Sequence, residues 1–414
     1  MIWNIARKEI VSNLLSYKFF IVIMLTIVLV FTSFFVMHKD FKERLSDYQL
    51  IRPNPEDPIA VLPPNTLSIF AKGLDEAMAR SFEITPIGIT VRAGQKSGNI
   101  VFSFFPTPDF LYVVKVILSL VALLFGFDQF SRERERGTLK LMLSNQVSRA
   151  GVLAGKWIGN FLSLTIPFLL VVLLGVAFLK LDREISFSAA QMARLAFILF
   201  LTVLYIGLFL SLGILISTLT RKTTSSVVAL LFSWTLLVFI FPNIGTLLAR
   251  QIVDVPSVLA LSEKRDQIWT REILLGIQDG DFRTRYSQIN TEQEKLEENY
   301  RNRFNRLVKI SKGINRISPV ASYVYAVTDL AGTGIGEEEN LKKSVISYKN
   351  SILPDVSTAA LERTETQYSA FQYRYRSVSE VLARGTLFDT AWLIFFNILF
   401  FALSYSALVR YDAR

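Results

Sequence analysis

The sequence has no cysteine, a single histidine and few charged residues for its length of 414. The absence of cysteine excludes disulfide scaffolds, thiol nucleophiles and cysteine-ligated zinc or iron–sulfur centres. One histidine, His38, excludes metal and general-base sites that need two. Charged residues make up 19% of the chain and apolar residues 51%, including 33 Phe, and the mean hydropathy is +0.38. Because soluble chains of this length carry more polar surface, the composition indicates a membrane protein.

Six stretches are apolar enough to cross the hydrocarbon core of a bilayer, which takes roughly 20 helical residues. Lys115 is their only formal charge, and it lies near one end of the second stretch, where its side chain can reach the headgroups. A buried helix of a large soluble core would explain any one stretch, but not six together. The expected spans are Phe19–Met37, Phe110–Phe127, Trp157–Leu179, Leu195–Leu219, Val227–Leu248 and Thr390–Val409. The first is too long for a signal peptide and lacks a cleavage site.

The short connections between these stretches carry most of the net charge of +10. Residues 1–18, 128–156, 220–226 and 410–414 together hold 13 Lys and Arg against 5 Asp and Glu. Short basic connections stay in the cytoplasm, whereas long segments cross the membrane largely regardless of charge. We therefore expect both termini in the cytoplasm and the chain in a bacterial plasma or inner membrane. The basic excess then reflects topology and nearby anionic lipid, not nucleic-acid binding.

Two segments flank the first span. Residues 1–18 are predicted to form an amphipathic helix in the inner membrane interface, although a cytoplasmic extension of the span is an alternative. Its apolar stripe consists of Trp3, Ala6, Ile10, Leu14 and Tyr17. The extracytoplasmic segment 38–109 begins with a helical continuation, after which closely spaced prolines end regular helix. Farther on, Ile84–Val91 and Asn99–Phe105 are rich in Ile, Val, Thr and Phe, which predicts a small hairpin.

The longest connection, residues 249–386, is predicted to form an extracytoplasmic helical domain before the last span. Ser262–Lys312 is dense in polar residues with apolar residues at helical spacings, which indicates one or two long helices interrupted at Gly280. A second helical region is expected over Glu337–Arg384, with a break near Pro354. The simplest arrangement of these helices is a hairpin.

Some residues in and near the spans have two interpretations. Ile317–Gly336 is weakly polar, which suits a segment that returns to the outer membrane interface and suits a soluble loop equally well. Pro167 and Pro242 are expected to bend or end their helices. Gly207 and Gly213 permit close helix approach, but they lack the small-xxx-small spacing that indicates a dimer face.

The connection 128–156 is the most informative segment for function. A run of alternating charges, Arg132–Arg136, meets Gly137 and leads into an amphipathic helix that contains Leu139, Leu141, Met142 and Leu143. A short cytoplasmic helix of this kind can fit a groove on a soluble partner and pass a rigid-body push to the attached spans. A solvated loop anchored at the membrane interface is the alternative.

This connection resembles that of ABC-2-type transporter permeases, where Glu-Arg-x-x-Gly-Thr-Leu follows the second span and a Ser-Arg pair comes shortly after. Gln146 stands where the family commonly has proline. The family layout agrees in outline with the interfacial helix, with the six spans and with two termini on the same side of the membrane. The insertion before the last span is larger than in the minimal family layout. The residues that fit the motif are Glu133, Arg134, Gly137, Thr138, Leu139, Leu141, Leu143, Ser144, Val147, Ser148 and Arg149.

The resemblance implies a permease driven by separate ABC ATPase subunits and paired with a second copy or a related permease. Glu135 and Arg136 are expected to make the main polar contacts with the ATPase subunit. No G-x-x-x-x-G-K-[ST] loop is present, so we expect ATP and Mg²⁺ on the partner, and no catalytic, metal or cofactor residue in this chain. The residues to which the coupling role carries over are Glu133, Arg134, Glu135, Arg136, Gly137, Thr138, Leu139, Leu141 and Leu143.

We therefore expect an all-α polytopic membrane protein with six transmembrane helices, an interfacial N-terminal helix, a cytoplasmic coupling helix and a largely helical extracytoplasmic insertion before the last helix. No acidic residue or histidine lies mid-span, which argues against proton or sodium coupling and suits the export of an amphiphilic or lipid-like substrate. The alternative is a membrane protein that transports nothing and relays ATPase motion to an extracytoplasmic partner.

Overall fold

The computed structural model describes residues 2–51, 58–78, 80–85, 88–93, 108–144, 148–362 and 368–411. Within these residues, six helical segments are long and apolar enough to cross a membrane, and each contains one of the six stretches expected from the sequence. The all-α polytopic architecture is therefore confirmed. The six segments are Tyr17–Leu50, Phe110–Glu135, Arg149–Lys180, Ala189–Leu219, Thr223–Ile252 and Val378–Val409.

Three of the six segments are built from several helical pieces. The first, third and fourth are single helices: α2 (Tyr17–Leu50), α9 (Arg149–Lys180) and α10 (Ala189–Leu219). Each of the others contains one π-helical turn, η2, η3 or η4, which locally widens the helix. Their pieces are α5 (Phe110–Tyr112), η2 (Val113–Leu118), α6 (Ser119–Gly126) and α7 (Ser131–Glu135); α11 (Thr223–Thr235), η3 (Leu236–Ile240) and α12 (Phe241–Ile252); and α17 (Val378–Val381), η4 (Leu382–Thr386) and α18 (Leu387–Val409).

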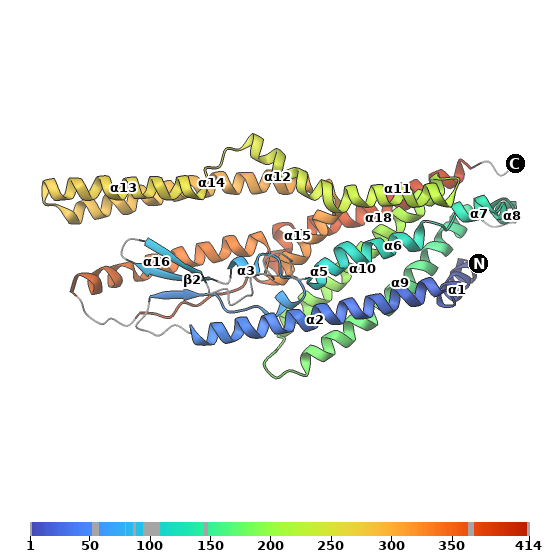
Figure 1. Ribbon diagram of the computed structural model, residues 1–414, viewed down its shortest axis with the longest axis horizontal. Coiled ribbons are helices and arrows are strands. Elements are labelled where there is room, and N and C mark those ends of the chain that lie inside the picture. The colour runs from blue at the N-terminus through green and yellow to red at the C-terminus, as the bar shows by residue number, and fades with distance from the viewer. Residues whose placement is uncertain are drawn as a thin grey trace.

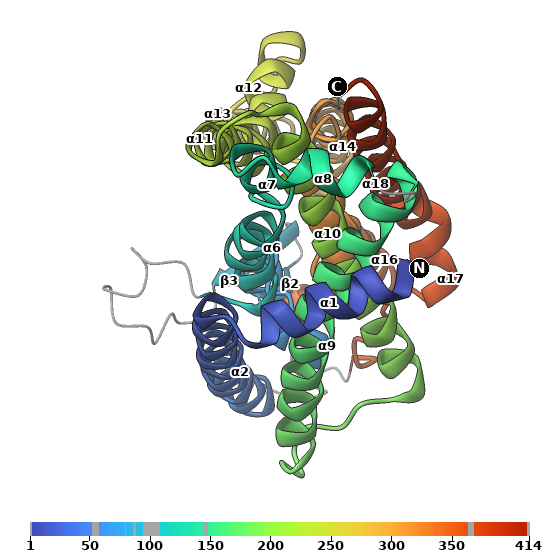
Figure 2. The same ribbon diagram turned by 90° about the vertical axis from the view of Figure 1, so that its right-hand side faces the viewer.

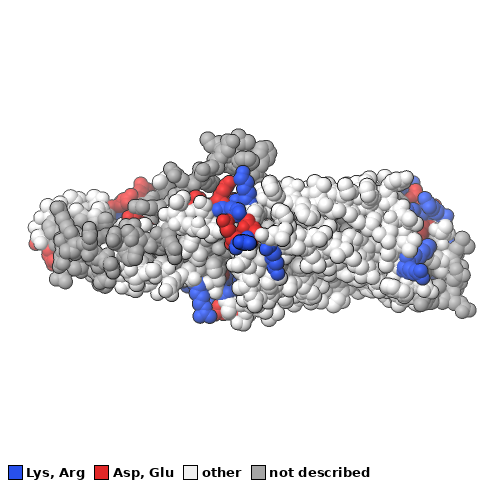
Figure 3. Space-filling model, turned by 90° about the horizontal axis from the view of Figure 1, so that it is seen from below, with Lys and Arg blue, Asp and Glu red and all other residues white. Residues whose placement is uncertain are grey.

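The helices form an elongated bundle with both chain ends at the same end of the molecule (Figure 1). We call this end, which carries α1 (Ile2–Leu14), α7 and α8 (Thr138–Ser144), the terminal end, and the opposite one the distal end. Figure 3 shows basic side chains at the terminal end, then a broad band with almost no charge, then a second group of charges farther along. An uncharged band between two charged zones is the surface expected of a membrane-embedded protein.

Helix α10 forms the centre of the bundle and packs against α6, α9, α15 (Pro319–Ala331) and α18. Gly126 of α6 and Gly213 of α10 make one of these crossings possible, because a Cβ atom on Gly213 would lie 2.8 Å from the carbonyl oxygen of Leu123. Gly213 therefore serves a contact within the chain. Pro167 lies inside α9, and Pro242 lies in the first turn of α12.

Helix α1 lies across the end of α9, nearly crosswise to the spans (Figure 2). The helix expected over residues 1–18 is thus present over Ile2–Leu14, and a new helix begins after the N-cap Ser16. Of the apolar stripe assigned to the membrane interface, Trp3 and Leu14 are exposed on the protein and only Ala6 is fully buried. The packed face is rotated by about one residue and includes Ile5 and Glu9.

The distal end carries a long helical hairpin, formed by α13 (Val258–Asp279) and α14 (Phe282–Asn315). Gly280 ends α13 in the left-handed region with φ of 74°, and Asp281 caps α14. The expected interruption at Gly280 is confirmed. At the base of the hairpin, Arg316 donates two hydrogen bonds to the buried carboxylate of Asp389, at 2.6 and 2.9 Å, which ties α14 to the last span.

A small mixed module lies beside the hairpin at the distal end (Figure 1). It contains helix α16 (Ile335–Glu362), the 3₁₀-helix η1 (Thr66–Ile69), the short helix α3 (Asp75–Met78) and an antiparallel sheet of β1 (Ile59–Val61), β2 (Arg80–Thr85) and β3 (Gly88–Ala93). The expected hairpin is misplaced, because Ile84 pairs with Ile89, so Ile84–Val91 spans two strands. The run divides after Thr85, where β2 ends, and β3 begins at Gly88. Asn99–Phe105 lies outside the described residues.

The second distal region also differs from the expectation. Helix α16 continues past position 354 to Glu362, so the expected break near Pro354 is wrong. Residues 368–376 are not helical. In this segment Phe371, Tyr373 and Tyr375 recur at every second residue and pack against the core of the distal module, and a period of two is typical of extended chain.

Ile317–Gly336 is not a surface loop. It contains helix α15, most of which is buried against α10 and α18. Tyr323 stacks on Tyr205 with ring centroids 4.2 Å apart, and its hydroxyl lies 2.9 Å from that of Thr202. Weak polarity in this segment thus signals burial within the protein.

A cluster of charges joins the distal module to the bundle, and we call it the distal joint: Arg194 on α10, Asp329 on α15, Glu337 on α16, and Arg376. The guanidinium of Arg376 donates to the fully buried Glu337 at 2.8 Å. Arg194 donates to the backbone carbonyls of Leu330 and Arg376. Burial and the hydrogen bond to Glu337 together raise the pKa of the nearby Tyr373. The distal module is therefore fixed to the fourth span.

Candidate coupling site at the terminal end

The segment singled out by the sequence folds into two short helices at the terminal end, α7 and α8. Gly137 separates them with φ of 74°, a left-handed backbone conformation that residues other than glycine adopt only with strain. The hydroxyl of Thr138 donates to the carbonyl of Glu133 at 3.2 Å, which closes the turn. The chain thereby changes direction between the end of the second span and α8.

Glu133 takes part in a buried ionic junction. The ammonium group of Lys156, on α9, lies 2.8 Å from Oε1 of Glu133 and 3.1 Å from Oε1 of Glu9 on α1. The side chain of Lys156 is only 4% exposed, so both ion pairs are shielded from water. We call Glu9, Glu133 and Lys156 the terminal junction. It joins three elements that are far apart in the sequence: α1, α7 and α9.

Arg134 fastens α7 to the ends of two other spans. Its guanidinium donates to the carbonyls of Thr218 and Thr220, at 2.9 and 2.7 Å, where α10 ends. The same group lies over the ring of Tyr411, 4.6 Å from its centroid, just after α18. A cation is favourable at this place, because the last carbonyls of a helix have no partner within the helix.

Glu135 and Arg136 point outward, as do Gly137 and Thr138, and all four are exposed. The carboxylate of Glu135 accepts hydrogen bonds from the backbone N–H and the hydroxyl of Thr223, at 3.2 and 2.8 Å. It therefore satisfies the first turn of α11, which begins the fifth span. Arg136 is the exposed residue of the motif that is best placed to meet a partner.

Of the three leucines of α8, the structure describes the side chain of only the first. Leu139 is fully buried and anchors the first turn of α8 to the bundle. Leu141 and Leu143 belong to the same helix, but their side chains lie outside the described part of the chain. Gln146 also lies outside it. The motif thus combines anchors bonded to or packed in the bundle (the half-buried Glu133 and Arg134 and the buried Leu139) with an exposed face, Glu135–Thr138, which we call the outer face.

The sequence reasoning missed a row of glycines that seats α1. Gly155 and Gly159 are one helical turn apart on α9, and a Cβ atom on Gly159 would lie 2.7 Å from Cβ of Glu9 and 2.8 Å from the carbonyl oxygen of Ala6. Glycine here lets the two backbones approach closely. The Gly-xxx-Gly spacing was visible in the sequence, although its partner helix was not.

Comparison with known proteins assigns the family. The family described as ABC-2 family transporter protein matches residues 3–413, nearly the whole chain. A stretch of 96 residues is 29% identical to a protein of Stutzerimonas stutzeri described as "Probable ABC transporter permease protein NosY". That alignment covers 23% of this chain and 35% of the relative, so the chain matches about a third of the relative's length. With its six apolar helical segments, the chain is a membrane protein that belongs to the ABC-2 family of transporter proteins.

Proposed function

We propose that this chain is the permease subunit of an ABC transporter and is moved by separate ATPase subunits that bind the outer face. The observation that carries this proposal is the division of one short motif into an exposed part and a part that is bonded to the bundle. The outer face is open to a partner, while the adjacent Glu133 and Arg134 are bonded to the ends of several helices. ATP and Mg²⁺ belong to the partner.

The bonds of α7 determine where a push on the outer face goes. Through Glu133 and Lys156 it reaches α1 and α9, through Arg134 it reaches the end of α10, and through Glu135 it reaches the start of α11. Four elements therefore receive the same displacement. A rigid-body shift of packed helices is an established way to convert a local contact into a change between two states.

The transported substrate is proposed to be amphiphilic or lipid-like and to be exported. Support comes from the long uncharged band in Figure 3, which offers few groups for a hydrophilic solute. A second permease copy is proposed to cover part of the fifth and sixth segments, whose apolar windows are only 11% and 17% buried, against 67% for α10. Both termini are proposed to lie in the cytoplasm of a bacterial cell with this protein in its plasma or inner membrane.

Charge reversal at Arg136 tests the proposal. The tagged full-length chain is purified from its own cells in mild detergent, and the co-purifying ATPase is quantified by mass spectrometry. Arg136→Glu is expected to reduce it about tenfold, because a like-charge contact would replace a complementary one. Arg183→Glu makes the same charge change at an exposed residue in the connection after α9, and it should leave the yield unchanged. Equal yields for Arg136→Glu and the unaltered chain would contradict the proposal.

The distal joint favours a second candidate function, in which the chain relays ATPase motion to an extracytoplasmic partner without transporting a solute. Replacing residues 267–296 with a short Gly/Ser turn removes the tip of the hairpin and spares α15, which is part of the bundle. A transporter should keep a substrate pathway and substrate-stimulated ATP hydrolysis in this variant. A relay should lose its cellular function while still binding the ATPase.

A further inference from the structure

The last helix of the bundle, α18, is held at its terminal end by an arginine from the start of α9. One guanidinium nitrogen of Arg149 lies 2.9 Å from the carbonyl oxygen of Leu408 and 2.5 Å from that of Val409. The same nitrogen lies 3.1 Å from the carbonyl oxygen of Tyr411, just beyond the helix. The last carbonyls of a helix lack the regular N–H partners of its interior, and a cation is favourable beside them. Arg149 therefore ties the end of α18 to α9.

Two further contacts hold the same end of α18. The guanidinium of Arg134, on α7, lies over the ring of Tyr411. Farther along α9, the ring of Trp157 meets that of Phe401 edge to face, with centroids 6.4 Å apart. Elements on both sides of α8 thus grip the end of the sixth span.

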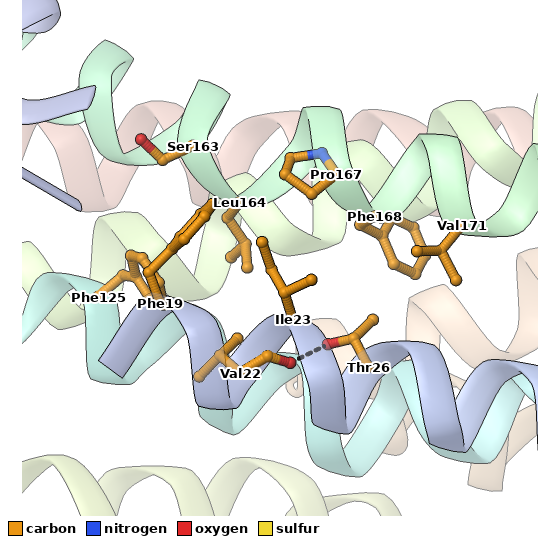
Figure 4. Close-up of a pocket in the computed structure, with 10 residues that line it drawn as sticks. All are labelled: Phe19, Val22, Ile23, Thr26, Phe125, Ser163, Leu164, Pro167, Phe168 and Val171. Atoms are coloured by element: carbon orange, nitrogen blue, oxygen red, sulfur yellow. Dashed lines mark hydrogen bonds between the residues drawn. The ribbon is translucent and has the colours of Figure 1, made fainter. Parts of the chain in front are cut away.

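Helix α9 is itself packed against α2, away from α18. Figure 4 shows Ile23 of α2 and Leu164 and Phe168 of α9 pointing into one interface. Phe19 and Phe168 are buried in this interface. Because apolar side chains fill the contact between the two helices, α2 and α9 form one packed unit. Arg149 attaches the end of α18 to that unit.

The distal end of α18 is held by a second arginine, Arg316, at the base of the hairpin. Besides its two hydrogen bonds to Asp389, its guanidinium lies over the ring of Phe388, 5.0 Å from the centroid. Its backbone carbonyl accepts a hydrogen bond from Nε1 of Trp392 at 2.5 Å. These partners lie in the first two turns of α18, and Arg316 directly follows α14. One residue therefore joins the hairpin to α18 through four contacts.

Between its two ends α18 is one uninterrupted helix. Its 23 residues span about 34 Å at about 1.5 Å per residue. The chain kinks just before this helix, at Gly385, whose φ of 146° residues other than glycine rarely adopt. The kink separates α18 from α17. A continuous helix can act as a rigid element, so a displacement at one end reaches the other.

We propose that α18 carries the displacement imposed by the ATPase from α7 and α9 to the hairpin of α13 and α14, with Arg149 and Arg316 as positioning residues at its two ends. This inference rests on the proposed ATPase coupling. It assigns the hairpin to the moving part of the molecule, whereas the distal joint attaches the distal module to the fourth span. The hairpin also meets α16 through an ion pair between Lys349 and the exposed Glu294, at 3.4 Å, and such pairs contribute little.

A distance measurement between the hairpin and the distal module tests this inference. The native chain has no cysteine, so Glu298→Cys on α14 and Lys343→Cys on α16, both at exposed positions, introduce two unique sites for spin labels. The labelled full-length chain is combined with its ATPase in lipid nanodiscs. We expect a non-hydrolysable ATP analogue to change the distance between the labels by about 2 Å, the size of shift seen between packed helices.

Substitutions at the terminal end of α18 should remove this change. Arg149→Met is expected to reduce it about twofold or more. Arg149→Lys keeps a cation beside the last carbonyls and should retain most of it. Arg410→Met is the control, since it neutralises an exposed arginine at the same helix end and should leave the change intact. The bound ATPase is quantified in every sample, which separates lost binding from lost transmission.

A double variant at the distal end remains informative if Arg149→Met fails to fold. Arg316→Met combined with Asp389→Leu replaces both partners of the buried pair by apolar residues, which costs little stability, and it should reduce the change as well. A full change in Arg149→Met or in the double variant, or an equal loss in Arg410→Met, would overturn the inference. An unaltered chain that binds the ATPase but shows no change would overturn the inference alone. A chain that binds no ATPase would overturn the proposed function too.

Discussion

The two ends of the molecule hold their buried charges in different ways. At the terminal junction, Lys156 alone links Glu9 and Glu133, and the outer face lies next to it in the open. At the distal joint, Glu337 accepts hydrogen bonds from both Arg376 and the hydroxyl of Tyr373. Backbone contacts reinforce the distal joint: Asn65 donates to the carbonyl of Ala331, and Tyr375 donates to that of Pro63, both at 2.7 Å.

Under the proposed function, the terminal junction is where ATPase motion enters the chain, and the distal joint is a fixed attachment of the distal module. A force on the outer face would then pass from α7 to α1 and α9 through the one ammonium group of Lys156. The distal module is attached by several independent bonds and follows the fourth span as one body. Substitutions at the two ends should therefore have separable effects.

Removal of the terminal ammonium should have the largest effect. Lys156→Met leaves Glu9 and Glu133 without their shared cation at a buried site, and breaking a buried ion pair in this way costs about 3–5 kcal/mol. We expect a lower unfolding temperature and loss of substrate-stimulated ATP hydrolysis. Lys156→Arg keeps the charge, so its unfolding temperature and its stimulated ATP hydrolysis should fall less. A wild-type unfolding temperature and wild-type stimulated hydrolysis in Lys156→Met would show that the terminal junction contributes to neither stability nor coupling.

A matched change at the distal joint should be milder. Arg376→Met leaves Glu337 with the hydroxyl of Tyr373 and the amide of Asn340 as hydrogen-bond donors, so we expect a loss of about 2–3 kcal/mol. Faster proteolysis of residues 368–376 would report it. ATPase co-purification should be unchanged in this variant. A parallel loss of ATPase binding would mean that the two ends are not separate.

Detaching α1 should have a smaller effect. Gly159→Leu places a side chain where α1 packs, 2.7 Å from Cβ of Glu9, and overpacking of this kind costs about 1–3 kcal/mol. Protease cleavage within residues 2–14 should rise. Gly313→Leu is the control, because a Cβ atom there meets nothing within 4 Å. Similar cleavage in both variants would contradict the role of the glycine row.

The smallest expected effect is a pH dependence at the connection between α9 and α10. Hydrogen bonds from Lys42, from the backbone N–H of Glu184 and from His38 hold the pKa of Asp182 well below its ordinary range. A lowered pKa contributes stability above the unfolded value of about 4, and this contribution is lost as the pH falls below it. The unfolding temperatures of the wild type and Asp182→Asn should therefore differ at pH 6 and converge at lower pH. A constant difference would refute this.

Hydropathy was sufficient to predict the six spans, because a bilayer requires about 20 apolar residues in each. The family resemblance was also recognisable, since the charges and the glycine of the motif that carries it are consecutive in the sequence. The division of that motif was not predictable: Glu133 and Glu135 are chemically alike, and only the positions of Lys156 and Thr223 make one an internal anchor and the other a helix cap.

The differences at the distal end have two physical causes. Helix α15 is weakly polar because it is buried among other helices, and composition alone does not show what packs against it. In the segment that contains Phe371 and Tyr375, the period of two does indicate extended chain, but the run is too short to be separated from the helical pattern around it.

Site-specific cross-linking tests the central claim most directly. Because the native chain has no cysteine, Arg136→Cys introduces a unique thiol on the outer face, which can carry a photo-reactive maleimide. The account predicts that illumination in native membranes links this position to an ATP-binding subunit, and that Arg183→Cys, labelled in the same way, does not. A chain that cross-links to no ATP-binding protein at Arg136, or that links to one equally well at Arg183, would contradict it.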